Sequence, residues 1–133
     1  MILSDVYKYL LNNPQLCAVL ETRTEDGKIY PNFARISSRA PYIVYRSLNP
    51  GGSLDEVLSQ EQAVFVITSE SFAKTAGISA ILTDLLDLPA ADIPAAAHII
   101  YYAKKTGGSD YVDELGRHVR ALNFTFKFRK RGA

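Results

Sequence analysis

The chain has 133 residues, of which 47% are hydrophobic and 22% are charged, and its net charge is +1. This length and balance indicate one globular domain, and no apolar run approaches the roughly 18 residues that a membrane span needs. The single cysteine, Cys17, excludes an internal disulfide and a cysteine-rich metal site. The first residues lack the basic start and long apolar core of a signal peptide, so we expect a cytoplasmic location.

Charge is distributed unevenly along the chain. From Lys104 onward there are eight Lys or Arg against three Asp or Glu, a net of +5, whereas the earlier part has seven against eleven, a net of −4. Such asymmetry is compatible with nucleic-acid contact, or with a surface that meets an acidic partner, including another copy of the chain. The simpler alternative is a solvated edge strand followed by a frayed tail.

Two helices are predicted before residue 21. In the first, apolar residues recur at helical spacing, which predicts an amphipathic helix of about three turns; they are Leu3, Val6, Tyr7, Leu10 and Leu11. The Asn12-Asn13-Pro14 run ends this helix, and Asn13 then caps a second, short helix that has Pro14 at its first position.

Residues 29–31 and 41–45 are predicted as strands on either side of a polar and basic loop over residues 32–40. The next segment, residues 50–60, is compatible with two structures. Ser53 and Glu56 have the spacing of a capping box, which predicts a helical turn, and a hairpin arm is the alternative.

Residues 62–88 form the hydrophobic centre of the chain. The five apolar residues at 63–67 predict a central strand that is covered on both faces. Ser69 or Ser71 can cap the following helix, and Asp87 with Pro89 marks its end. The apolar stripe of that helix consists of Ile78, Ile81, Leu82 and Leu85.

The C-terminal part predicts two strands separated by a polar loop. Residues 96–102 read as a strand, and residues 104–116 as the loop. The last strand has strict alternation, typical of an antiparallel strand with one solvated face; its apolar residues are Leu122, Phe124, Phe126 and Phe128. Residues 130–133 are expected to be disordered.

The resulting element order is α-α-β-β-β-α-β-β in a single domain over residues 1–133. This order predicts an α+β fold with a mixed, mostly antiparallel sheet packed by the N-terminal helix and one central helix.

The sequence argues against an enzyme, and we expect neither a cofactor nor a metal. His98 and His118 fall on predicted strands without metal-ligand or nucleophile–base spacing, and His98 is best interpreted as a structural histidine. No phosphate loop, dinucleotide fingerprint or nucleophile elbow occurs.

A small nucleic-acid-binding domain is the alternative function. A basic cluster and nearby aromatic residues would serve it; these are Lys127, Arg129, Lys130 and Arg131, with Tyr101, Tyr102 and Phe124. The sequence pI of about 7.8 is low for a dedicated binder. A structural or interaction module is favoured instead, because charge is polarised along a chain that lacks catalytic residues. Head-to-tail rings need two different complementary patches on one protomer, and separate acidic and basic surfaces would supply them.

The order of features resembles the tail-completion family of long-tailed bacteriophages, also called tail terminators or head–tail joining proteins. An Ile-Tyr-Pro at residues 29–31 stands about ten residues before a Pro-Tyr-Ile-Val-Tyr at 41–45. The N-terminal helix precedes them. After them come the strand and helix over residues 63–88 and then the closing strand over residues 122–129.

The resemblance implies a non-enzymatic phage or prophage protein that forms a ring, usually a hexamer, on the tail tube. The ring would end tube polymerisation and present a surface for head joining. Its partners would be other copies of the chain, the tail-tube protein and the head–tail connector protein, with no membrane. It would act in the bacterial host cytoplasm during assembly and stay at the tail–head junction of the virion.

If the family interpretation holds, charged residues in loops should make the ring and tube contacts. The basic candidates are Arg35, Arg39, Lys104 and Lys105, and the acidic candidates are Glu25, Asp26, Asp113 and Glu114. Charges at the rim of an interface steer assembly more than they stabilise it.

Overall fold

The computed structural model describes residues 2–20, 28–32, 40–49, 53–54, 59–87 and 98–130. Three helices and six strands occur in this part of the chain. In chain order they are α1 (Ile2–Leu11), α2 (Pro14–Val19), β1 (Ile29–Pro31), β2 (Tyr42–Ser47), β3 (Ser53–Leu54), β4 (Ser59–Ser69), α3 (Phe72–Leu86), β5 (His98–Val112) and β6 (His118–Lys130).

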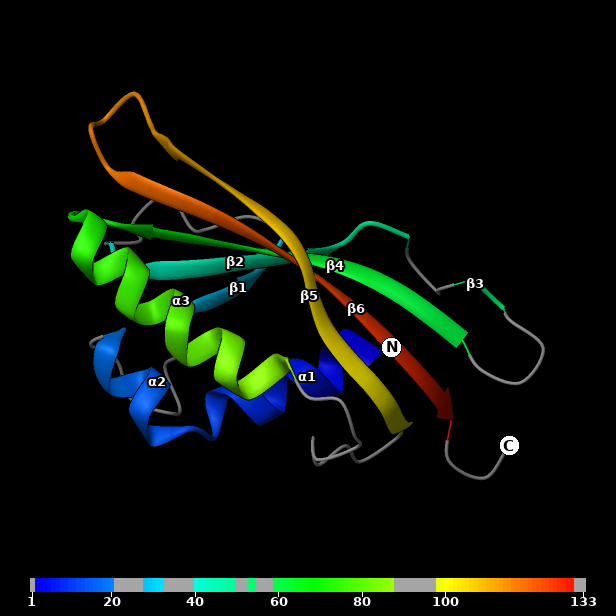
Figure 1. Ribbon diagram of the computed structural model, residues 1–133. Coiled ribbons are helices and arrows are strands. Elements are labelled where there is room, and N and C mark those ends of the chain that lie inside the picture. The colour runs from blue at the N-terminus through cyan, green and yellow to red at the C-terminus, as the bar shows by residue number, and fades with distance from the viewer. Residues whose placement is uncertain are drawn as a thin grey trace.

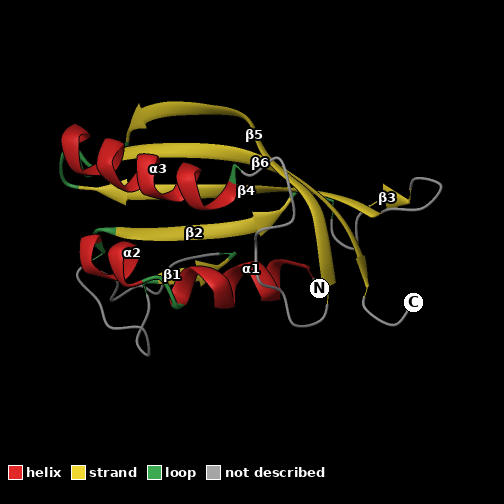
Figure 2. Ribbon diagram, turned by 60° about the horizontal axis from the view of Figure 1, so that its bottom comes forward, coloured by secondary structure: helices red, strands yellow, loops and turns green. Residues whose placement is uncertain are grey.

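The strands form one mixed sheet in the order β1-β2-β4-β6-β5, and β3 pairs with β4 outside this path. The β1–β2 pair is parallel and every other pair is antiparallel. Figures 1 and 2 show the three helices packed together on one face of the sheet. The predicted α+β class and element order are therefore confirmed, with the two-residue β3 as an addition.

The core lies between the helices and the inner face of the two central strands. On β6 the alternation holds, because its four predicted apolar residues are buried. Phe65 on β4 contacts Phe124 edge to face, with ring centroids 5.5 Å apart. Burial of each such side chain stabilises the fold by roughly 1.5–3 kcal/mol, so these two strands anchor the sheet.

Coverage of β4 differs between its two faces. Its inner face carries fully buried side chains such as Ile67, whereas Val66 on the outer face is only half-buried. All three helices lie on the inner side (Figure 2). The prediction that both faces are covered is therefore met in part, because Val64 on the outer face is buried although no described helix lies over it. Val64 is shielded from solvent beside its register partners Arg46 and Asn123.

The predicted helix caps are largely confirmed. Asn13 Oδ1 accepts a hydrogen bond from the backbone N–H of Leu16, at 2.8 Å, and Pro14 starts α2. For α3 the sequence offered either Ser69 or Ser71 as the N-terminal cap. The cap is Ser71, whose hydroxyl accepts a hydrogen bond from the backbone N–H of Lys74. Ser69 instead hydrogen-bonds Thr75.

Helix α3 buries the predicted stripe unevenly. Ile78 and Leu82 are fully buried, whereas Ile81 and Leu85 are partly buried at the margin of the core. The helix ends at Leu86 with Asp87 as its C-terminal cap. The predicted end residues 88 and 89 lie outside the described part.

The region after residue 103 corrects the sequence prediction. In place of a polar loop over residues 104–116, β5 continues to Val112, and the connection to β6 is confined to residues 113–117. Two register shifts, between Ile100 and Tyr102 and between Lys105 and Gly107, interrupt the pairing with β6. Backbone hydrogen bonds to β6 hold this half of β5, whose side chains bury little, so its sequence carries no alternating apolar signal.

The segment over residues 50–60 forms a hairpin where it is described. Ser53 and Leu54 pair antiparallel with Gln60 and Ser59, so the helical turn starting at Ser53 is wrong and the hairpin alternative is right. Residues 55–58 lie outside the described part. At the C-terminus, β6 includes Lys130, and residues 131–133 lie outside the described part.

Two buried titratable side chains, His98 and Cys17, belong to the structural core. His98 Nδ1 lies 2.9 Å from Asp5 Oδ2, which ties the start of β5 to α1, and its ring meets Phe128 edge to face. The expected structural role of His98 is confirmed. Cys17 is buried, as expected, and burial raises the pKa of its thiol.

Candidate interaction surfaces

The turn between β5 and β6 is organised by the carboxylate of Asp113. Its Oδ1 accepts hydrogen bonds from the backbone N–H groups of Leu115 and Arg117, at 3.0 and 2.9 Å. Its Oδ2 accepts from Arg117 Nε at 2.8 Å. Gly116 takes a positive φ of 76°, which glycine adopts without strain. These hydrogen bonds, led by those from Arg117, lower the pKa of the Asp113 carboxyl.

A second ion pair braces the hairpin below the turn. Arg120 on β6 donates to both carboxylate oxygens of Asp110 on β5, at 2.6 and 3.2 Å, and this lowers the Asp110 pKa. The Arg120 guanidinium also lies over the Phe72 ring, 5.5 Å from its centroid. The first residue of α3 is thereby tied to the hairpin.

This end of the molecule is rich in exposed apolar side chains. Among the described residues, six large hydrophobic side chains are exposed, and four of them lie on the hairpin end or beside it. They are Phe72, Tyr111, Val112 and Leu115, and we call them the apolar tip. Leu115, at the turn, is 75% exposed. An exposed apolar cluster rimmed by ion pairs has the layout of a protein-binding surface.

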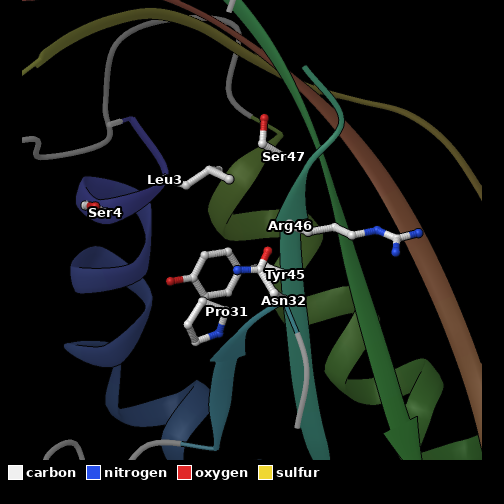
Figure 3. A pocket seen from close by; sticks show the side chains of 7 residues that line it. All are labelled: Leu3, Ser4, Pro31, Asn32, Tyr45, Arg46 and Ser47. Atoms are coloured by element: carbon white, nitrogen blue, oxygen red, sulfur yellow. The ribbon is translucent and has the colours of Figure 1, made fainter. Parts of the chain in front are cut away.

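A cavity of about 350 Å³ lies between the first turn of α1 and the ends of β1 and β2 (Figure 3). We call it the α1 cavity. Its lining consists of Leu3, Ser4, Pro31, Asn32, Tyr45, Arg46 and Ser47. Asn32, which has a positive φ of 65°, donates its backbone N–H to the carbonyl of Tyr45 at 2.8 Å, which fixes this wall.

The α1 cavity is suited to a neutral, apolar guest. Leu3, Pro31 and the ring of Tyr45 supply its apolar surface, and the Arg46 guanidinium extends away from α1 across β4 (Figure 3). Burial, and secondarily the neighbouring Tyr7, raises the pKa of Tyr45 to about 12, so its hydroxyl is neutral at physiological pH. The lining offers no charge aimed at a ligand.

A basic and aromatic surface follows the other half of the β5–β6 pair. Lys127 Nζ lies 5.1 Å from the centroid of Tyr102, and the Arg129 guanidinium lies 5.8 Å from that of Tyr101. These residues were expected as a cluster in the nucleic-acid alternative, and the sheet does bring them together. Phe124 from the same set is fully buried and serves as core.

The four predicted interface candidates in the described part of the chain form two separate pairs. Lys104 and Lys105 are exposed on β5 rather than in a loop, and Asp113 and Glu114 lie in the turn, roughly 25 Å further along the strand. Asp113 is engaged in the turn itself, whereas Glu114 is exposed. The other four candidates, Glu25, Asp26, Arg35 and Arg39, lie outside the described residues.

Sequence reasoning missed both the apolar tip and the α1 cavity. Tyr111, Val112 and Leu115 stand within the segment taken as a polar loop, so their apolar character was the available signal. The cavity had no such signal in the sequence, because its walls come from three elements that are distant along the chain.

No metal-binding arrangement of three or more His, Cys, Asp or Glu side chains occurs among the described residues. Within the same part of the chain, no helix has the length and apolar character needed to cross a bilayer.

These features define a small α+β protein, a helix-backed mixed sheet whose candidate sites are an apolar tip, a shallow cavity and a basic strand surface. No family model matches the sequence, and no curated protein matches it. The chain is similar to a chain in a solved structure described as "Virion of native gene transfer agent (GTA) particle". The TM-score is 0.67 at 16% identity, covering 92% of this chain and 90% of that chain. The two chains therefore share a fold over nearly their whole lengths.

Proposed function

We propose that this chain is a non-enzymatic structural protein of a phage or prophage virion, and more specifically a tail-completion protein. It forms a ring, six-membered in the family that the sequence resembles, on the end of the tail tube. The ring stops tube growth and presents a surface to the head connector. It assembles in the bacterial cytoplasm and stays at the tail–head junction.

The observation that carries this proposal is the fold likeness to a virion chain over 92% of the present chain. The order of sequence features supports the narrower role in the tail. Exposed apolar side chains at one end of the sheet supply the kind of surface that assembly needs. Surface charges steer the encounter between partners, with Lys104 and Lys105 on β5 and Glu114 in the turn as the exposed candidates in the described part.

The test combines the purified chain with the tube protein encoded beside it. Light scattering and sedimentation velocity should show a ring-sized oligomer, either of the chain alone or once tube protein is added. In negative-stain images, the mean tube length should fall as the proportion of the chain rises, and tube protein alone is the control. A chain that stays monomeric and never binds tubes contradicts the proposal.

A further inference from the structure

The apolar tip and the α1 cavity lie toward opposite ends of the sheet. The tip is next to Ser69, which pairs with His118, whereas Ser47 in the cavity wall pairs with Ala63. The six residue steps along β4 from Ala63 to Ser69 span roughly 20 Å. Figure 1 shows the β5–β6 turn at one end and the N-terminus of α1 well away from it. A tip therefore reaches such a cavity only in another copy of the chain.

The two surfaces match in shape and polarity. The tip protrudes and ends in Leu115, a flexible apolar side chain with 75% of its surface exposed. The cavity is concave, with Leu3, Pro31 and the Tyr45 ring as apolar walls. Its volume of about 350 Å³ is at the small end of the range for ligand pockets, roughly 300–1,000 Å³, and suits one or two side chains.

The electrostatics at the edge of the cavity also suit the tip, although the lining itself presents no formal charge to a ligand. Glu114, which precedes Leu115, is exposed, so its carboxylate accompanies the tip. The cavity mouth includes Leu3 and Ser4 in the first turn of α1, the positive end of that helix dipole. The acidic residue of this turn, Asp5, is buried and faces His98, so it does not oppose an incoming carboxylate at the surface.

We propose that the apolar tip of one copy docks into the α1 cavity of the next copy, in a head-to-tail contact. This inference rests on the proposed ring, whose subunit contact it identifies. A contact between two different patches is heterologous, and it closes into a ring when the rotation between neighbours divides a full turn. Leu115 of one copy fills the cavity of the next copy, and Glu114 of the first copy lies at the first turn of the neighbour's α1.

The first experiment removes each half of the contact separately. Leu115→Ser shortens the tip, and Ser4→Trp blocks the cavity at an exposed helix position without touching the core. Each variant should weaken self-association by about tenfold or more, measured by sedimentation velocity. Tyr101→Ser is the matched control, because Tyr101, like Leu115, is an exposed large hydrophobic side chain but lies outside both surfaces; its association should be unchanged. Circular dichroism and thermal unfolding verify that each variant is folded.

Mixing the two variants tests the head-to-tail arrangement. Leu115→Ser keeps an intact cavity and Ser4→Trp keeps an intact tip, so the mixture should form one-to-one heterodimers that do not extend. A symmetric tip-to-tip contact predicts instead that Ser4→Trp assembles normally and that mixing restores nothing. That outcome overturns the inference.

The outcomes also separate this inference from the proposed function. If wild-type rings form and cap tubes while both variants assemble normally, the tip–cavity contact is wrong and the ring function stands. If Leu115→Ser assembles normally but no longer binds tube protein, the tip contacts the tube, and the inference is again overturned. A wild-type chain that never assembles, with or without tube protein, contradicts both.

Discussion

Asp113 uses both carboxylate oxygens to close the β5–β6 turn. One oxygen accepts two backbone N–H groups and the other accepts the Arg117 side chain. Hydrogen bonds to the ionised form favour that form, which explains why the pKa of this carboxyl is lowered although its partial desolvation acts in the opposite direction. The direction of the shift fixes how the turn responds to pH. Its contribution to stability is present above the ordinary Asp pKa of 3.8 and is lost as the pH falls through the lower folded-state value.

An NMR titration tests this pH dependence at single residues. The backbone amide signals of Leu115 and Arg117 should shift in acid with a midpoint below 3.8, the ordinary Asp pKa. Asp113→Asn should abolish this transition, because the group that titrates is gone. Glu114→Gln changes the net charge equally at the neighbouring exposed position and should leave the midpoint in place. A midpoint at or above 3.8 in the wild-type protein is incompatible with the proposed hydrogen bonding.

At the scale of elements, the β5–β6 hairpin contains adjacent glycines in different surroundings. A Cβ atom added to Gly108 would lie 2.7 Å from the backbone oxygen of Ala121, closer than real contacts allow. A Cβ added to Gly107 would meet only the Asn123 side chain, at 3.8 Å. One glycine is therefore required by the close approach of the two strands, and the other is not.

Alanine substitution should separate the two positions. Gly108→Ala should destabilise the protein by about 1–3 kcal/mol, the usual cost of forcing an added group into a packed site. Gly107→Ala should change the free energy of unfolding by less than about 0.5 kcal/mol, as most surface substitutions do. Urea denaturation of both variants beside the wild-type protein measures the difference. Equal effects at the two positions would show that the strands do not approach at Gly108 as described.

The same hairpin shows what the sequence could and could not predict. Strand β6 was predictable, because Phe124 and its apolar neighbours alternate with polar residues and one face is buried. The outer half of β5 was not, since exposed side chains and paired glycines on a strand look like those of a loop. There the partner strand, rather than the local sequence, determines the conformation.

The helices were predictable for a related reason. Apolar spacing and the capping residues Asn13 and Ser71 are local signals, and the structure uses them as predicted. The candidate surfaces depend on distant elements instead. The α1 cavity joins residues from α1, β1 and β2, and no local pattern in a single sequence records that proximity.

At the scale of the whole molecule, the described surfaces divide between the two ends of the sheet. The β5–β6 turn carries the apolar tip with its ion pairs. The opposite half of β5 and β6 carries the exposed side chains of Lys104, Lys105 and Arg129. Since a heterologous assembly needs unlike patches on one protomer, this polarity suits head-to-tail contact better than a two-fold dimer.

Within the described part of the chain, the basic surface around Lys127 and Arg129 is the part best placed to bind nucleic acid, and we expect its binding to be weak. One face of Tyr101 and one face of Tyr102 are already covered by Arg129 and Lys127 of the same chain, so stacking a base there displaces an internal contact. We expect a gel mobility shift at low salt that is sequence-independent and disappears near 0.2 M salt, as binding through a few phosphate contacts does at roughly that concentration. The double variant Lys127→Gln, Arg129→Gln should weaken the shift, whereas Lys74→Gln on α3 should not. Nanomolar affinity at physiological salt would contradict this expectation and favour a nucleic-acid-binding domain, because only a surface built for phosphates retains such affinity when counterions compete.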